Sequence, residues 1–158
     1  MKKSLMLCLV LALTIFPVCA GGTGDQQVSE NSASGKTQSG ENMNITLTIG
    51  TKTFSATLED NATSRAFVSL FPLTLDMSEL NGNEYYNYLE TSLPAASTNP
   101  KKINAGDIKL YGSNCVVIFY KSFSTSYSYT TLGKISDTSG LLEALKSGGG
   151  KVTFSLSE

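Results

Sequence analysis

The side chains that could do chemistry in this chain of 158 residues are few, and the missing types exclude several mechanisms. Histidine is absent, which excludes a Ser-His-Asp triad, a Cys-His pair and any zinc site that uses histidine. The three cysteines, Cys8, Cys19 and Cys115, have no Cys-x-x-Cys spacing, so they form no metal or dithiol motif. Cofactor motifs are also absent, and we expect neither a metal nor a cofactor.

Charged side chains offer little more. The net charge is −1 and the lysines are scattered, so we expect no nucleic-acid partner. Arg65 is the single guanidinium and hence the one candidate for a catalytic cation, although a solvated helix residue is the interpretation that we prefer. Asp76 with Glu79, or Glu84 with Glu90, could pair in space, but we expect solvated surface carboxylates.

Aromatic side chains are the best candidates for a binding site. Tyrosine gives flat apolar area with a polar tip, which suits a peptide or a small ligand. The alternative is that about half of these residues belong to the core or to strand surfaces, because aromatic residues favour strands. The candidates are Tyr85, Tyr88, Tyr111, Phe119, Tyr120, Phe123, Tyr127 and Tyr129.

Residues 1–20 are typical of a signal peptide. Lys2-Lys3 provides the positive start, and an apolar run from Leu5 to Phe16 follows. This run is shorter than the roughly 20 residues that span a bilayer. Val18-Cys19-Ala20 fits a cleavage site before Gly21, so the segment predicts export.

A second interpretation of the same segment makes Cys19 a lipidation site. Phe16-Pro17-Val18-Cys19 resembles a bacterial lipobox, in which Cys19 would be acylated after cleavage. Residues 21–43 are rich in Gly, Ser and Thr and are expected to form a flexible tether. The protein would then be a cell-envelope lipoprotein, touching the membrane only through that lipid, or else a secreted or periplasmic protein. Cys115 would remain alone in an apolar run, as a buried core thiol.

The remaining residues, 44–158, predict one domain, which we expect to be monomeric. Apolar residues alternate from 44 to 59 around a turn at Gly50-Thr51 and predict a β-hairpin. A helix is expected over 63–71, ended by Pro72.

Strands and turns dominate the rest of the chain. Leu73 to Met77 alternate as a strand, Asn81-Gly82 predicts a turn, and 83–105 reads as a strand followed by a long surface connection. The near-continuous apolar run over 115–120 favours a central strand buried on both faces. The further predictions are strands over 107–111, 130–135 and 152–156, a loop over 121–130 and a helix over 139–147.

The order of these elements and several short strings resemble the cyclophilin-like domain family of bacteria, a relative of the true cyclophilins. The resemblance covers roughly residues 44–156. It implies a mostly β fold: a closed cyclophilin-like β-barrel with two short helices that cover its ends. The strings are Asp60-Asn61-Ala62-Thr63, Phe67 to Leu75, Gly106-Asp107-Ile108, Ile118-Phe119-Tyr120 and Leu132-Gly133-Lys134-Ile135.

The resemblance also implies where a catalytic site would lie. True cyclophilins are peptidyl-prolyl isomerases that use an arginine above a phenylalanine floor, beside a histidine or tryptophan rim. Here the stretch 72–90 holds no Arg or Lys, the floor falls near Val117 and the rim near Tyr129. A fixed donor is what would stabilise the twisted amide, so we expect a non-catalytic peptide or small-ligand binding module. The alternatives are a weak prolyl isomerase that assists folding outside the cytoplasm, and a purely structural domain.

Overall fold

The computed structural model describes residues 43–158. The expected signal peptide, the lipidation candidate Cys19 and nearly all of the expected tether lie outside the described residues. Within the described part, no helix has the length and apolar character needed to cross a membrane.

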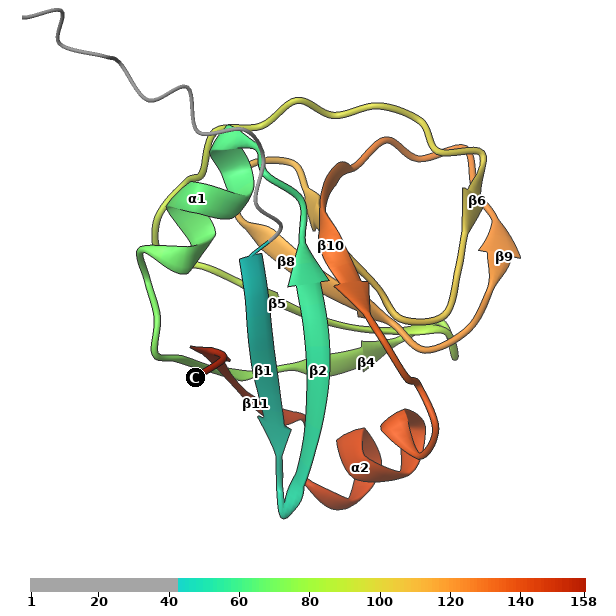
Figure 1. Ribbon diagram of the computed structural model, residues 1–158. Coiled ribbons are helices and arrows are strands. Elements are labelled where there is room, and N and C mark those ends of the chain that lie inside the picture. Colours follow the sequence, from blue (N-terminus) through green and yellow to red (C-terminus); the bar gives the residue numbers. More distant parts are fainter. Residues whose placement is uncertain (1–42) are drawn as a thin grey trace, which may run out of the picture. The chain divides into compact units, whose positions relative to one another are not determined.

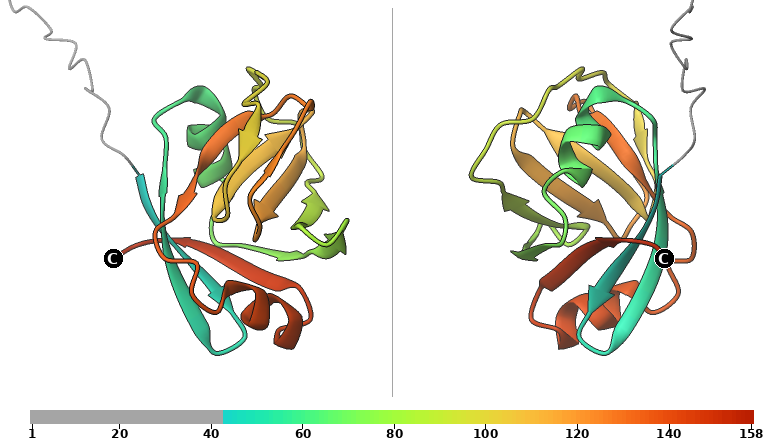
Figure 2. Two further views of the ribbon diagram at one scale, coloured as in Figure 1. Left: turned by 90° about the vertical axis from the view of Figure 1, so that its right-hand side faces the viewer. Right: turned by 60° about the vertical axis from the view of Figure 1, so that its left-hand side comes forward.

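The strands follow the alternating patterns of the sequence and form one nine-stranded sheet that curls into a barrel (Figures 1 and 2). The order along the sheet is β3-β11-β1-β2-β10-β7-β8-β5-β4, and β6 and β9 form a separate pair. The expected hairpin is confirmed, and so are the last four long strands. The strands are β1 (Met43–Ile49), β2 (Lys52–Leu58), β3 (Leu73–Asp76), β4 (Ser78–Leu80), β5 (Glu84–Tyr88), β6 (Lys102–Ile103), β7 (Asp107–Tyr111), β8 (Cys115–Phe119), β9 (Phe123–Ser124), β10 (Thr130–Ile135) and β11 (Lys151–Leu156).

The two end strands of the sheet, β3 and β4, are consecutive in the chain, and the bend between them brings the ends of the sheet together. β3 pairs with β11 and β4 pairs with β5, and only Met77 separates β3 from β4. The Met77 amide donates to the Gly150 carbonyl at 2.9 Å. Asn87 Nδ2 donates to the Asp76 carbonyl at 2.7 Å, so a side chain joins β5 to the end of β3. The expected barrel is therefore confirmed: the sheet is nearly closed, and these contacts join its two ends in place of a strand pairing between β3 and β4.

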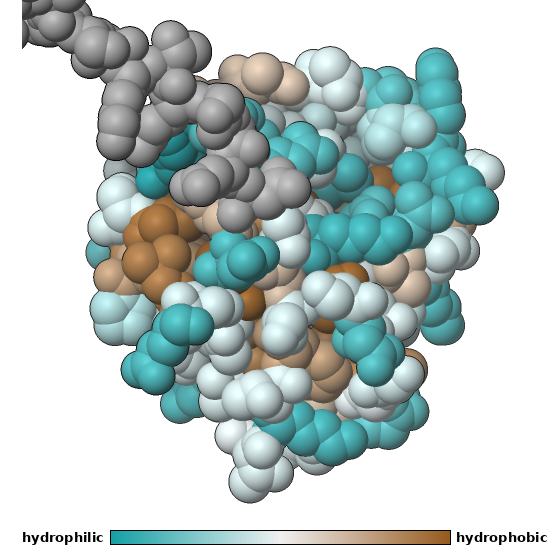
Figure 3. Space-filling view, viewed as in Figure 1, coloured by the Kyte–Doolittle hydropathy of each residue, from teal (hydrophilic) through white to brown (hydrophobic). Residues whose placement is uncertain are grey.

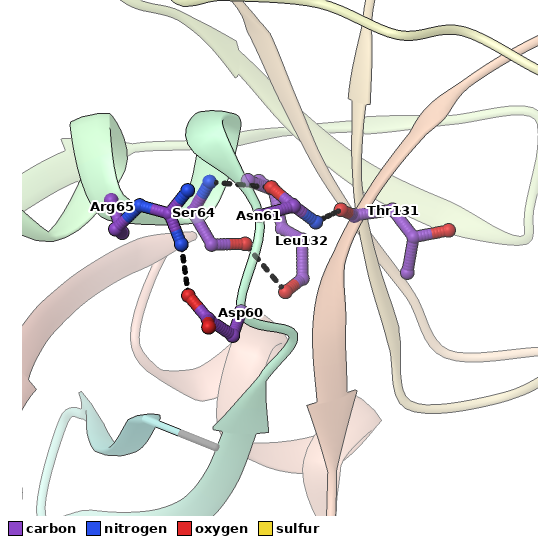
Figure 4. Close-up of polar contacts among 6 residues, drawn as sticks. All are labelled: Asp60, Asn61, Ser64, Arg65, Thr131 and Leu132. Carbon is purple, nitrogen blue, oxygen red and sulfur yellow. Dashed lines mark hydrogen bonds and ion pairs between the residues drawn. The ribbon is translucent and has the colours of Figure 1, made fainter. Parts of the chain in front are cut away.

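Two short helices lie at opposite ends of the barrel (Figure 1), as expected. Asn61 caps α1 (Ala62–Val68) by accepting from the Ser64 amide at 2.8 Å, while its own Nδ2 donates to the Thr131 carbonyl. Ser64 Oγ donates to the Leu132 carbonyl, so the first turn of α1 is fixed to β10 (Figure 4). This helix ends three residues before the expected position, and α2 (Leu141–Ser147) begins two residues later than expected.

The apolar side chains form two clusters, one on each face of β8. Val116 and Ile118 point into the barrel, where they pack with residues such as Phe67 and Phe154. Cys115, Val117 and Phe119 point outward and are also buried, because Ile103, Phe123 and Tyr129 pack over them. Burial on both faces explains the continuous apolar run, and the predicted central strand is confirmed.

The outer cluster matters for function because a second layer of chain packs over it on the outside of the barrel wall. Its cover comes from the β6–β9 pair and the chain around it. The segment expected as a loop over 121–130 thus contains a short strand and a bridge from Tyr129 to Thr98. In the view of Figure 3, hydrophobic residues reach the surface as separate patches among hydrophilic ones.

Candidate functional site

A groove of about 270 Å³ lies on the outer face of β5, β8 and β7, where the second layer leaves the wall uncovered. Leu80 and Asn81 contribute to its lining from the β4–β5 turn, and Cys115 and Val117 contribute from β8. Glu84 is the one charged side chain in the lining. Five of the seven tyrosines of the chain also line it, and we call it the tyrosine groove; they are Tyr86, Tyr88, Tyr111, Tyr127 and Tyr129.

Strand alternation explains why these side chains meet. Successive residues of a strand point to opposite faces, so Glu84, Tyr86 and Tyr88 share the outer face of β5. The antiparallel register places Tyr86 opposite Val117 and Tyr88 opposite Cys115. Tyr111 ends β7, opposite Cys115 on the other side of β8. The register of three strands therefore assembles most of the groove.

The rings form two groups, with edge-to-face or tilted geometry. Tyr86 and Tyr88 lie 5.9 Å apart at 86°. Tyr111 lies 6.1 Å from Tyr127 at 87°, and 5.7 Å from Tyr129 at 55°. Tyr129 is 7% exposed, whereas Tyr88 and Tyr127 are 61% and 62% exposed. The groove therefore has one ring anchored in the outer cluster and others open to a ligand.

Glu84 is half-buried in this aromatic setting. Burial raises the pKa of its carboxyl group above the ordinary value, and the negative charge of Glu79 raises it further. Within residues 43–158 the Glu84 side chain takes part in no ion pair and no side-chain hydrogen bond. The expectation of a solvated surface carboxylate is therefore wrong for Glu84, because the turn and strand around it remove water from one side.

The thiol of Cys115 is 4% exposed at the base of the groove. Burial raises its pKa to about 11, the Glu84 charge adds to that, and a hydrogen bond with Tyr88 acts in the opposite direction. A thiol in this state is almost wholly protonated at neutral pH and is a poor nucleophile. The expected buried thiol is confirmed.

Four of the eight sequence candidates for ligand binding line the tyrosine groove, namely Tyr88, Tyr111, Tyr127 and Tyr129. Glu84 and Tyr86 were not among those candidates. Alternation with Tyr88 was the available signal for Tyr86, because residues two apart share a face of a strand.

The other four candidates lie elsewhere. Tyr85 points into the barrel, 6% exposed, with its ring 5.9 Å from that of Tyr120. Tyr120 is half-buried and packs against the inner cluster. Phe119 is fully buried in the outer cluster, and Phe123 packs over it with ring centroids 5.7 Å apart. The packing of these four residues accounts for their presence without a ligand.

Cationic side chains are placed away from the groove. Arg65 lies exposed on α1, where its guanidinium pairs with Asp60 (Figure 4). Lys121 is exposed and lies over the Tyr120 ring, 5.7 Å from its centroid. Within the described residues, no lysine or arginine lines the tyrosine groove.

Lys109 is a buried cation that the sequence analysis did not single out. It is 6% exposed on the outer face of β7, where Nζ lies 3.2 Å from Thr131 Oγ1 and 3.7 Å from Asp107 Oδ2. Together with Thr131 and Asp107 it lines a different hollow, beside β2 and β10. The signal was the alternation of Asp107 and Lys109 with apolar residues, which places both charges on one face.

The positions implied by the family resemblance do meet in the tyrosine groove. Val117, at the expected floor, and Tyr129, at the expected rim, both belong to its lining. The stretch expected to carry an arginine supplies Glu84 to the same lining. The positions at which the resemblance implies a floor and a rim thus lie in one groove, whose single charged lining residue is acidic. In the described part of the chain, no three His, Cys, Asp or Glu side chains gather as a metal site.

Comparison with known proteins agrees with this architecture. The model of the family described as the Cyclophilin-like family matches residues 47–157, which run from within β1 to just past β11. No curated protein matches the sequence. The match covers more than half of the chain and confirms the resemblance inferred from its residues. The chain belongs to the cyclophilin-like family.

Proposed function

We propose that this domain is a non-catalytic binding module, and that the tyrosine groove holds a small ligand or a short peptide segment. The observation that carries this proposal is the lining itself: five tyrosines and one carboxylate, with no lysine or arginine among the described residues that form it. Tyrosine rings provide contact area at low entropic cost, and their hydroxyl groups orient a polar partner. A purely structural domain would have no need of a concave aromatic site.

Prolyl isomerisation is the less favoured function for a chemical reason. Rotation about the amide passes through a twisted state whose nitrogen regains its lone pair, and catalysis needs a donor fixed beside it. A carboxylate only accepts hydrogen bonds when ionised, so Glu84 is the wrong group for this task. Lys109 is a donor, but it is directed to Asp107 and Thr131.

A prolyl isomerisation assay on the purified protein separates the two functions. We expect the rate with a short Xaa-Pro peptide to equal the uncatalysed rate, in the wild type and in Arg65→Ala and Lys109→Met variants. A wild-type rate well above background that falls in either variant would overturn the proposal.

Binding itself is measured by ligand-observed NMR with a library of small neutral, acidic and basic compounds. We expect hits whose signals return to those of the free compound in a Tyr127→Ala/Tyr111→Ala double variant, since both rings are exposed and line the groove. Circular dichroism verifies that the variant is folded, because Tyr111 also packs against Tyr129 of the outer cluster. The proposal would be contradicted if no compound bound the wild type, or if every compound that bound it also bound the double variant equally well.

We further propose that the protein is exported, with residues 1–20 as its signal peptide. The support is the charged start, the short apolar run and the small residues before Gly21. Mass spectrometry of the mature N-terminus distinguishes the two routes. Gly21 as first residue indicates a freely secreted or periplasmic protein, and an acylated Cys19 indicates a lipoprotein. An intact Met1 on protein isolated from the natural source would contradict export.

A further inference from the structure

The electrostatics of the tyrosine groove define the ligand more closely than its shape does. Its one charged lining residue, Glu84, is half-buried and has no cationic partner among the described residues. The negative charge of Glu79 on β4 also acts on it. A half-buried carboxylate without a partner has lost part of its hydration and gained nothing in return. A cationic group in the groove would compensate the charge of the carboxylate and so offset the hydration that it has lost.

The tyrosines favour the same kind of ligand. The face of an aromatic ring carries negative charge density, so a cation within about 6 Å of a ring centroid is attracted to it. Tyr88, Tyr111 and Tyr127 are 61%, 45% and 62% exposed, and their rings are accessible from solvent. Aromatic rings grouped around a cavity bind quaternary ammonium ligands in other proteins.

The size of the groove limits how much of a ligand it can enclose. Its volume of about 270 Å³ lies just below the usual range of small-molecule sites, which begins near 300 Å³. This space suits one compact functional group with a short substituent. No lysine of the described residues lines it. Lys109 is paired with Asp107 in another hollow, and Lys121 lies over Tyr120.

We propose that the tyrosine groove binds a small organic cation, whose alkylammonium group lies between the Glu84 carboxylate and the exposed tyrosine rings. This inference rests on the proposed binding function and specifies its ligand class. Anionic ligands are disfavoured by the charges of Glu84 and Glu79. A neutral ligand would leave the Glu84 carboxylate uncompensated.

Choline and its uncharged isostere 3,3-dimethylbutan-1-ol provide a matched pair of probes. They have nearly the same shape and differ in the charge, so their comparison isolates the electrostatic contribution. In ¹H–¹⁵N spectra of the full mature chain, we expect choline to shift the resonances of groove residues such as Tyr86 and Tyr127. We expect the isostere to bind at least about tenfold more weakly, which corresponds to 1.4 kcal/mol. Equal binding of the two probes, or no shift with choline, would overturn the cation proposal.

Variants identify the contributing side chains. Glu84→Gln keeps the size of the side chain and removes its charge, so choline affinity should fall about tenfold while binding of the isostere stays unchanged. Glu143→Gln makes the same change on the exposed surface of α2 and should leave both affinities unchanged. Tyr127→Ala removes an exposed ring and should weaken choline about threefold or more. If Glu84→Gln retains full choline affinity in a folded protein, the proposal is wrong.

Acid should weaken the interaction for the same reason. The titratable groups that act on or face Glu84 are Glu79 from β4, Cys115 from β8, and Tyr120 and Tyr129 beyond it. The pKa values of Cys115, Tyr120 and Tyr129 are raised, so these groups stay neutral in acid and at neutral pH. We expect choline affinity to fall as Glu84 becomes protonated, with the fall displaced to lower pH in Glu79→Gln because the charge that raises the Glu84 pKa is removed. In Glu84→Gln the affinity should lose its pH dependence. Affinity independent of pH in the wild type would contradict the role of Glu84.

The two proposals fail in different ways. If the isostere or other neutral compounds bind the groove as well as choline does, the binding module stands and the cation preference is refuted. If the compound library gives no groove ligand at all, the binding function itself is refuted.

Discussion

The hydroxyl group of Tyr120 donates a hydrogen bond of 2.9 Å to Oε1 of Glu79, and so ties the end of β8 to β4. The same oxygen accepts from the Gly82 amide at 2.7 Å, inside the turn that leads into β5. Burial first, then this hydrogen bond and the Glu79 charge, raise the pKa of Tyr120 to about 12. One carboxylate thus holds the turn that carries Glu84 at the mouth of the tyrosine groove.

Removing the Tyr120 hydroxyl should loosen that turn. We expect Tyr120→Phe to lower the free energy of unfolding by about 0.5–1 kcal/mol, because the bond is charge-assisted but partly exposed to solvent. Tyr127→Phe is the matched control, since its ring is 62% exposed and its hydroxyl makes no side-chain hydrogen bond within the described residues. Urea denaturation of both variants checks this prediction, and equal stabilities would contradict it.

Glu84 should make the folded protein less stable above its pKa. Its carboxyl pKa is raised in the folded state, so the native protein binds the proton more tightly than the unfolded chain does. The favourable contribution is complete below the pKa of Glu84 in the unfolded chain. It is lost as pH rises through the higher pKa of the folded state. We expect Glu84→Gln to be more stable than the wild type at neutral pH, and this gain to disappear in acid, where both states are protonated.

Thermal denaturation over this pH range measures the difference, with Glu143→Gln as the exposed comparison. A wild type that is more stable than Glu84→Gln at neutral pH would show that the carboxylate has a partner in the folded state. Residues kept at a cost in stability are typical of binding sites.

Cys115 should resist alkylation in the folded protein. With a pKa of about 11, its thiolate fraction at mildly alkaline pH lies up to about a hundredfold below that of an ordinary cysteine. We expect iodoacetamide to modify the peptide that contains Cys115 slowly in the native protein and at the normal rate in urea, as followed by mass spectrometry. Rapid modification of the native protein would mean that the outer cluster opens readily.

Gly133 should tolerate no larger residue. It lies in β10 where that strand pairs with β2, and a Cβ atom there would overlap the Thr57 carbonyl oxygen and lie 2.7 Å from Leu58 Cα. We expect Gly133→Ala to lower stability by about 2–4 kcal/mol, because two paired backbones would have to separate.

The control for this change is Gly82→Asn, at a turn position with φ of 69° and open space around it. Asparagine adopts this left-handed conformation readily, so stability should change by less than about 0.5 kcal/mol. A Gly133→Ala variant as stable as Gly82→Asn would show that the barrel seam adapts easily.

The sequence predicted the barrel well because its signals are local. Alternating apolar residues predicted both hairpin strands. The continuous apolar run from Cys115 to Phe119 predicted a strand that is buried on both faces. The helix ends were less accurate, since α1 stops at Val68 and the chain then turns without a further signal. The β6–β9 pair was missed, because two-residue strands leave no detectable period.

The residues of the site were predicted only in part, because they depend on which face of each strand points away from the barrel interior. Tyr85 and Tyr86 are neighbours of the same type, and only the packing of the barrel decides that Tyr85 points inward and Tyr86 outward. Glu84 looks like any surface carboxylate in the sequence. In the fold it lies opposite Phe119 of β8, a neighbour distant along the chain that the sequence alone does not reveal.

The position of β4 at one end of the sheet has a consequence for self-association. Its three residues are exposed, and within the described residues only β5 pairs with it. An open edge of this kind can recruit a strand from another molecule, and proteins commonly suppress such recruitment with short edges and charged side chains. β4 is short and carries Glu79 at its centre. We therefore expect the carboxylate that fastens the turn to disfavour the addition of a strand from a second chain at this edge as well.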